Sequence, residues 1–160
     1  FGLPIISSNM DTITELEMAN AITESGGMSI FHRFLTIERN VELFKQTKHP
    51  DQVSISIGLG NAGIERASAL VDAGASIVCV DVAHGHSKDV NQTIRDLRAK
   101  YKNNIYVIAG NVATYAGADY LAAAGADAIK VGIGSGSVCT TRIKTGFGAP
   151  TDSAPGVSQG

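Results

Sequence analysis

The sequence predicts an α/β fold, a (β/α)8 TIM barrel of which about six βα units lie in this chain. Three observations lead to this prediction. Short runs rich in Ile and Val alternate with segments whose apolar residues recur three and four positions apart. Polar residues gather after nearly every apolar run, while the turns from helix to strand are short and contain few polar residues. A doubly wound open sheet would instead concentrate its polar residues at one switch point.

The predicted strands are short apolar runs bounded by Gly, Ser, Asn or Asp. In chain order they are residues 4–10, 28–33, 53–59, 77–83, 105–110 and 128–133. Because continuous apolar strands joined by helical segments pair in parallel, we expect each helix to cross over the outside of the sheet.

The predicted helices lie between these runs. They are residues 15–27, 36–47, 62–75, 88–102 and 114–126. Two of these segments end in Ala-Gly-Ala before the next strand, at 73–75 and 124–126. The glycine at the centre of each is expected to take the left-handed conformation that ends a helix.

Six strands do not close an eight-stranded barrel, so two βα units are expected elsewhere. The chain begins at Phe1 rather than Met, and its last residues, 151–160, show neither apolar periodicity nor a helix stop. We therefore expect residues 1–150 to form a partial catalytic barrel, residues 151–160 to form an irregular tail, and the chain to be part of a longer protein.

Composition excludes several functional classes. The 160 residues are 44% apolar and 18% charged with a net charge of -2, which is typical of a globular protein. No block of Lys and Arg indicates nucleic-acid binding, and no apolar run approaches the roughly 20 residues of a membrane span. The first residues lack the basic, apolar and small-residue zones of a signal peptide, so we expect a cytoplasmic protein.

The chain contains two cysteines in different surroundings. Cys79 lies inside an apolar run and is interpreted as a small buried side chain. Cys139 follows three closely spaced glycines and precedes two threonines and Arg142. A thiol in a polar loop beside a cation is suited to nucleophilic catalysis, although a cysteine that merely caps a turn is the alternative.

Two other polar clusters follow predicted strands. Asp81 precedes His84 and His86, and this cluster either binds a ligand, holds a metal, or consists of a capping carboxylate with solvated imidazoles. His32 and Arg33 follow the second strand and either face an anionic ligand or lie in solvent.

Four motifs together resemble the inosine-monophosphate dehydrogenase and guanosine-monophosphate reductase family, which are purine-nucleotide oxidoreductases built on a (β/α)8 barrel. The resemblance extends from Pro4 to about Pro150 in the family's order and spacing. The motifs are SSNMDT (7–12), DVAHGHS (81–87), AGNVAT (109–114) and GIGSGSVCTTR (132–142).

The resemblance implies a role for each matching residue. Cys139 would attack C2 of the purine to form a covalent thioimidate, and Thr141 would assist proton transfer. The implied substrate-binding residues are Ser8, Met10, Lys130 and Ser137, and the implied cofactor-binding residues are Asp81, Ala83 and Asn111, the last of which also lies in the implied nucleotide pocket. The main-chain ligands of a potassium ion would be Gly134, Gly136 and Cys139.

Two features favour GMP reductase within this family. Residues 36–52 are too few to contain the paired CBS modules that the dehydrogenases usually carry, and the DVAHGHS loop resembles that of the reductases. The expected reaction is NADPH-dependent deamination of GMP to IMP by a homotetramer, with a Glu beyond this chain assisting as acid.

Other functions remain as alternatives. One is an IMP dehydrogenase without CBS modules, which would oxidise IMP to XMP with NAD. Another is a flavin-dependent or sugar-phosphate barrel enzyme, and a third is a non-catalytic nucleotide-binding barrel module. The pairing of Cys139 with Thr141 argues against the last of these, because a binding protein needs no nucleophile.

Overall fold

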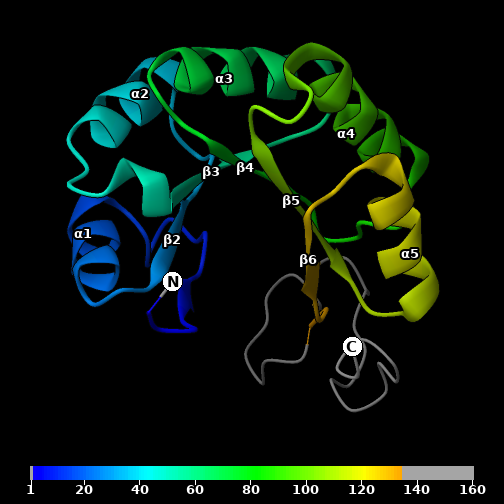
Figure 1. Ribbon diagram of the computed structural model, residues 1–160, viewed down its shortest axis with the longest axis horizontal. Coiled ribbons are helices and arrows are strands. Elements are labelled where there is room, and N and C mark those ends of the chain that lie inside the picture. Colours follow the sequence, from blue (N-terminus) through cyan, green and yellow to red (C-terminus); the bar gives the residue numbers. More distant parts are fainter. Residues whose placement is uncertain (1, 135–160) are drawn as a thin grey trace.

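Six parallel strands lie side by side in chain order in the computed structural model of the protein, which describes residues 2–134. The strands are β1 (Ile6–Ser7), β2 (Met28–Phe31), β3 (Val53–Ile57), β4 (Ile77–Asp81), β5 (Tyr106–Val112) and β6 (Ala128–Val131). The sheet is strongly curved, and the helices form an outer layer around it (Figure 1). This is the arrangement of a partial (β/α)8 barrel, and the prediction of parallel βα units is confirmed.

Each helix connects two neighbouring strands. The helices are α1 (Leu16–Glu24), α2 (Ile37–Lys45), α3 (Gly60–Asp72), α4 (Lys88–Tyr101) and α5 (Tyr115–Ala124), with a short 3-10 turn at Pro50–Gln52 before β3. Gly125 ends α5 in the left-handed conformation with φ of 112°, and Gly74 follows α3 with φ of 107°. Both glycine helix ends were predicted, and both are confirmed.

The strand boundaries differ from the predicted ones mainly where polar residues follow a strand. The first run was predicted to be extended over residues 4–10, but β1 covers only Ile6–Ser7. The chain turns directly after it, where the Met10 amide donates to the Ser8 carbonyl (2.9 Å). At β5 the strand runs past residue 110 to Val112, with an irregular register between Gly110 and Val112.

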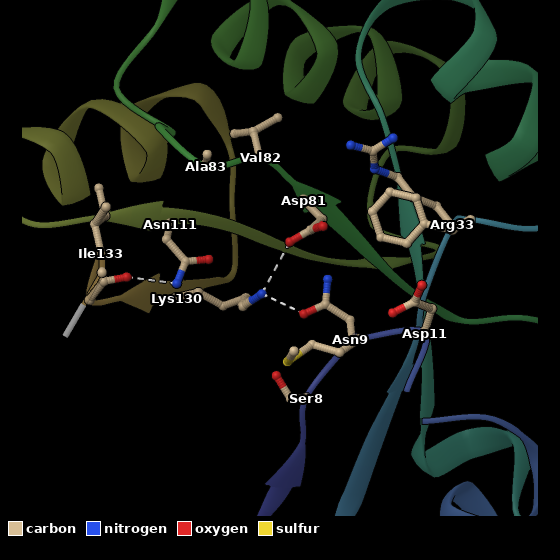
Figure 2. Close-up of a pocket in the computed structure, with 14 residues that line it drawn as sticks. Ser8, Asn9, Asp11, Arg33, Asp81, Val82, Ala83, Asn111, Lys130 and Ile133 are labelled. Atoms are coloured by element: carbon tan, nitrogen blue, oxygen red, sulfur yellow. Dashed lines mark hydrogen bonds and ion pairs between the residues drawn. The ribbon is translucent and has the colours of Figure 1, made fainter. Parts of the chain in front are cut away.

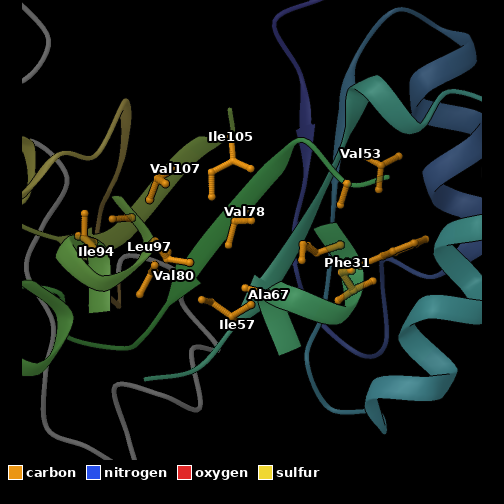
Figure 3. Close-up of a cluster of buried hydrophobic side chains, with 14 of the residues drawn as sticks. Phe31, Val53, Ile57, Ala67, Val78, Val80, Ile94, Leu97, Ile105 and Val107 are labelled. Carbon is orange, nitrogen blue, oxygen red and sulfur yellow. The ribbon is translucent and has the colours of Figure 1, made fainter. Parts of the chain in front are cut away.

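The main hydrophobic core lies between the sheet and the helices. Its side chains come from the outward-facing positions of the strands and the inner faces of the helices, as in Figure 3, where Val78, Val80 and Val107 meet Ile94 and Leu97. A second cluster lies on the inner face of the sheet and comprises Met28, Ile30, Ile77, Cys79 and Ile108. Burial on both faces explains why β4 reads Ile-Val-Cys-Val without polar alternation before Asp81.

Hydroxyl side chains cap three helices where they leave the strand ends. Thr36 accepts from the Arg39 amide (3.2 Å), Ser87 from the Val90 amide (3.4 Å) and Thr114 from the Gly117 amide (3.1 Å). Each cap fixes the point at which a strand-end loop becomes a helix, and so it holds the loops that carry the polar motifs.

Arg98 connects the helix-to-strand turns at the opposite end of the sheet. Its guanidinium donates to the carbonyls of Gly125 (2.7 Å), Lys102 (2.8 Å) and Ile105 (2.8 Å) and pairs with Asp127. Asp127 also accepts from the Val107 amide (2.7 Å). These contacts join α4, β5 and the turn before β6 far from the polar loops. Within residues 2–134, no helix combines the length and apolar character required to cross a membrane.

Candidate active site

A cavity of about 480 Å³ lies at the carboxyl ends of the strands. Its walls come from the loop after β1, the loop after β2, the ends of β4 and β5, and β6 with the residues that follow it. Figure 2 shows polar side chains from these separate elements pointing toward one another. This is the face of the barrel on which the sequence predicted the active site.

Most of the predicted site residues within the described part of the chain line this one cavity. Those residues are Ser8, Met10, Asp81, Ala83, Asn111, Lys130 and Gly134. Six of them belong to four motifs spread over more than half of the sequence, and Lys130 lies two residues before the last motif, so the fold is what brings them together. The other predicted residues, which are Gly136, Ser137, Cys139 and Thr141, lie outside residues 2–134, and their predicted roles stay predictions.

The Lys130 ammonium lies at the centre of the polar wall (Figure 2). Its Nζ donates to Asn9 Oδ1 at 2.8 Å and lies 3.3 Å from Asp81 Oδ1. The side chains of Lys130 and Asp81 are 24% and 19% exposed, so this ion pair is largely shielded from solvent. Because the hydrogen bond to Asn9 is added to the ion pair, the ammonium is held on two sides.

Gly110 allows the side chains of Lys130 and Asp81 to approach each other. In the sheet Asp81 is paired with Gly110, and Gly110 is paired with Lys130, so the glycine lies between the two charged residues. A Cβ at Gly110 would lie 2.6 Å from the Lys130 carbonyl oxygen and 2.7 Å from its Cβ. The absence of a side chain therefore permits the close approach of β5 and β6 at the cavity wall.

Asn111 is oriented by hydrogen bonds at the irregular end of β5. Its side-chain Nδ2 donates to the Gly132 carbonyl at 2.8 Å, and its backbone N–H donates to the Val82 carbonyl at 2.8 Å. The peptide bond between Gly110 and Asn111 is cis. These contacts tie the ends of β4, β5 and β6 together beside the cavity.

Arg33 and Phe34 form another part of the wall. The Arg33 guanidinium carbon lies 5.1 Å from the centroid of the Phe34 ring, a cation–π contact, and the ring itself is 60% exposed. Arg33 Nε is buried and makes no hydrogen bond within the described residues. Arg33 therefore faces the cavity, which is one of its two predicted environments.

His32 lies in neither of its predicted environments. Its side chain is buried, Nδ1 accepts from the Phe34 amide (3.2 Å), and Nε2 lies 3.1 Å from Glu15 Oε1. Because Nδ1 accepts, Nε2 carries the proton that is donated to Glu15. His32 thus fixes the loop after β2 rather than contacting a ligand or solvent, since it is part of a buried hydrogen-bond network.

Asn40 and Arg66 complete that network. Asn40 donates to the His32 carbonyl (3.2 Å), and Arg66 donates to Asn40 and to the Leu35 carbonyl (2.8 Å). Burial lowers the pKa of Arg66, and the positive charge of Arg33 lowers it further. The loop that presents Arg33 is therefore held from α2 and α3.

Cys79 is confirmed as a buried side chain. It lies in the inner apolar cluster with an exposed fraction of 0%. Burial raises the pKa of its thiol to about 12, so the thiolate is not populated at neutral pH. Cys79 is therefore not a nucleophile, and Cys139 is the remaining cysteine of the sequence.

The described residues contain no side-chain cluster suited to a transition metal. No group of three or more His, Cys, Asp or Glu residues converges within residues 2–134. His86 instead packs against Tyr120, with ring centroids 4.9 Å apart. The predicted potassium site uses main-chain oxygens, and of its members only Gly134 falls in the described part, at the cavity edge.

Asn9 is the principal site residue that sequence reasoning missed. It lies between Ser8 and Met10, which were both assigned to the nucleotide pocket, and it is buried with an exposed fraction of 9%. A buried amide in a polar loop was the available signal. Its partner Lys130 lies 121 residues away in the sequence, so the contact itself was not visible there.

Comparison with known proteins agrees with this geometry. The family model described as the IMP dehydrogenase / GMP reductase domain matches residues 1–156. The GMP reductase of Vibrio atlanticus is 39% identical over 157 residues, an alignment that covers 96% of this chain and 45% of that protein. The inosine-5'-monophosphate dehydrogenase of Escherichia coli K12 is 48% identical over 124 residues, which are 78% of this chain and 25% of that protein.

A solved structure matches as well. The crystal structure of inosine 5' monophosphate dehydrogenase from Legionella pneumophila superposes with a TM-score of 0.85 at 57% identity, covering 92% of this chain. The present chain spans 45% of that chain and of the Vibrio reductase. Fold, cavity and sequence therefore agree, and the chain belongs to the IMP dehydrogenase / GMP reductase domain family.

Proposed function

We propose that the protein is a nicotinamide-dependent oxidoreductase of purine mononucleotides that converts GMP to IMP. The observation that carries the proposal is the single cavity at the strand ends. Seven residues that the family resemblance assigns to substrate, cofactor or ion line it, although they come from separate segments between residues 8 and 134. A cavity of about 480 Å³ is also in the range of small-molecule sites.

The residues present fit a nicotinamide nucleotide. Asp81 supplies a carboxylate at the cavity wall, and carboxylate oxygens accept hydrogen bonds from the hydroxyls of a ribose. Lys130 holds one oxygen of that carboxylate and is itself held by Asn9, and Ala83 lines the same cavity without a bulky side chain. When bound, NADPH supplies the hydride that the purine C2 receives.

The covalent chemistry is assigned to Cys139, which lies outside the described residues. Its thiolate would form a bond to C2 of GMP, and the C2–N bond would break to release ammonia, which takes up a proton from an acid assisted by Thr141. After reduction at C2, the C–S bond would break, releasing IMP and regenerating the thiolate. The net change is one hydride and two protons taken up per GMP, with one ammonium ion released.

The chain between β2 and β3 favours the reductase. Residues 32–52 contain α2 and the 3-10 turn at Pro50–Gln52, so β2 connects to β3 through a single helical crossover without an additional module. The alignment to the Vibrio GMP reductase likewise runs along 96% of this chain. The DVAHGHS loop, which contains Asp81 and Ala83, supports the same choice.

A second candidate is the IMP dehydrogenase reaction, in which NAD oxidises IMP to XMP. Sequence identity favours it, because the Legionella dehydrogenase is 57% identical and the Escherichia coli dehydrogenase 48% identical, against 39% for the Vibrio reductase. Both reactions use the same thiol attack at C2, so the described cavity serves either one.

One experiment tests both candidates. The complete protein is incubated with GMP and NADPH, and separately with IMP and NAD, while absorbance at the reduced-nicotinamide band, ammonia and nucleotide products are measured. We expect GMP-dependent NADPH oxidation with one ammonia released per IMP formed. Brisk formation of XMP with GMP left intact would establish the dehydrogenase instead. Binding of nucleotide without turnover of either would support the non-catalytic module.

A further inference from the structure

The Lys130 ammonium has three N–H donors, and the structure accounts for two of them. One is donated to Asn9 Oδ1 at 2.8 Å, and a second faces Asp81 Oδ1 at 3.3 Å. The two acceptors come from the loop after β1 and from the end of β4, so they hold the ammonium from separate elements. Figure 2 shows Lys130 extended toward both side chains along the cavity wall. A third N–H direction is therefore left for a group inside the cavity.

The immediate charge around Lys130 is balanced. Asp81 neutralises the ammonium at close range, and Asn9 contributes a dipole but no charge. The described cavity wall as a whole is also balanced, because Arg33 and Lys130 are matched by Asp11 and Asp81. A phosphate requires an excess of positive charge, whereas a neutral oxygen requires only an oriented donor.

We propose that Asn9 is a positioning residue that, together with Asp81, directs the remaining N–H of Lys130 to a neutral carbonyl or amide oxygen of the bound ligand. The burial of Asn9, at 9% exposed, keeps its amide from turning to solvent. This inference rests on the proposed function for the identity of the ligand, but the positioning of Lys130 by Asn9 does not depend on which reaction occurs.

The positioning is tested by chemical labelling without any substrate. The complete protein is treated briefly with acetic anhydride, and acetylation of Lys130 is measured by peptide mass spectrometry relative to exposed Lys48. Asn9→Ala should accelerate labelling of Lys130 by about fivefold, the factor that corresponds to one hydrogen bond. Asn9→Asp keeps an acceptor oxygen at the same place and adds a negative charge, so Lys130 should label no faster than in the parent. Equal rates in parent and Asn9→Ala would overturn the proposal.

Asn91→Ala is the matched control. Asn91 lies on α4 away from the cavity, where its side chain donates to the Tyr120 carbonyl (3.3 Å) and accepts from Arg95 (2.8 Å). Removing it also deletes a partly buried amide, so a general loosening of the fold would appear in both variants. Faster labelling of Lys130 in Asn91→Ala, to the same extent as in Asn9→Ala, would count against a specific role for Asn9.

The class of ligand atom is tested on the unsubstituted protein, so this test holds even if Asn9→Ala fails to fold. Guanosine, inosine, nicotinamide and inorganic phosphate are added at matched concentrations before labelling. We expect at least one of the three neutral compounds to slow acetylation of Lys130, and inorganic phosphate to leave it unchanged. Protection by phosphate, or by none of the four, would overturn the assignment of a neutral acceptor.

The two proposals fail in different ways. If neither GMP nor IMP is turned over but Lys130 labelling responds to Asn9, the proposed function fails and the positioning stands. If turnover is observed and the labelling rate of Lys130 does not change in Asn9→Ala, the proposed function stands and the positioning role of Asn9 fails. Steady-state kinetics provide a second readout of the positioning role. If Asn9→Ala leaves the Lys130 ammonium poorly oriented, kcat should fall and the KM of the ligand that Lys130 contacts should rise, with partial recovery in Asn9→Asp.

Discussion

Lys130 and Asp81 belong to strands that are not neighbours, yet their side chains meet at 3.3 Å across the intervening Gly110. The contact follows from the register of three parallel strands, in which Asp81, Gly110 and Lys130 occupy one row. Because the central position carries no side chain, the lysine can reach over it. This row places a cation, a carboxylate and an open space at the wall of the cavity.

Gly110→Ala should destabilise the protein by about 1–3 kcal/mol, the usual cost of forcing an extra group into a packed site. The new Cβ would lie 2.6 Å from the Lys130 carbonyl oxygen, so β5 and β6 would have to separate. Urea unfolding measures the change. Gly2→Ala is the control, because a Cβ there meets no atom within 4 Å. Equal stability of the two variants would show that β6 can move away from β5 without lowering the free energy of unfolding.

Arg98→Lys should lower the free energy of unfolding by about 1–3 kcal/mol, because a lysine cannot donate to three separate carbonyls and a carboxylate at once. Arg39→Lys is the matched control, since Arg39 forms an exposed ion pair with Glu42, in which the two side chains are 49% and 58% exposed. We expect that control to cost less than about 0.5 kcal/mol. Thermal and urea unfolding of both variants provide the measurement.

The same Arg98→Lys variant should keep its KM values for nucleotide and cofactor. Arg98 lies at the helix-to-strand turns, whereas the cavity lies at the carboxyl ends of the strands. A large change in KM without loss of stability would contradict this separation of stability and function.

Cys79 should make stability fall with rising pH above about 9. In the folded protein burial raises the pKa of this thiol from 9.0 to about 12, so the unfolded chain loses its proton first. The stabilisation is complete below the unfolded pKa and is lost as the pH rises toward the folded one, at roughly 1.4 kcal/mol per pH unit.

Cys79→Ala removes that dependence. We expect the parent to be more stable at neutral pH, and its advantage over the variant to shrink by about 1.4 kcal/mol at pH 10. Urea unfolding of both proteins between about pH 8 and pH 10.5 checks this, because all other titrating groups are common to the pair. Parallel stability curves would mean that the folded thiol titrates normally.

Cys139→Ala should abolish turnover while nucleotide binding persists, since no other side chain assigned to the site is a thiol that could form the bond to C2. Cys79→Ala is the control for loss of a thiol and should leave kcat nearly unchanged, because Cys79 is buried in the inner apolar cluster. Steady-state rates and equilibrium nucleotide binding on both variants measure the two effects. Equal activity of Cys139→Ala and the parent would refute covalent catalysis.

Local sequence patterns were sufficient to predict the fold class and the end of the barrel at which the polar loops gather. Residues 77–80 read Ile-Val-Cys-Val without polar alternation because the sheet is buried on both faces, and this pattern indicates a parallel strand without reference to the rest of the chain. Asp81 and Asn111 follow or end such strands, and parallel strands bring those ends to one edge. Their proximity could therefore be predicted, and both residues line the cavity.

The pairing and burial of individual polar groups, in contrast, depend on the folded arrangement of the whole sheet. His32 follows a strand in the same way as Asp81, yet it is buried against Glu15 because α1 packs beside the end of β2. Asn9 and Lys130 are 121 residues apart, and their contact depends on the curvature that brings β1 toward β6. Local periodicity reports which side of an element is apolar, whereas such pairings depend on strand register and sheet curvature, which are summed over the whole barrel.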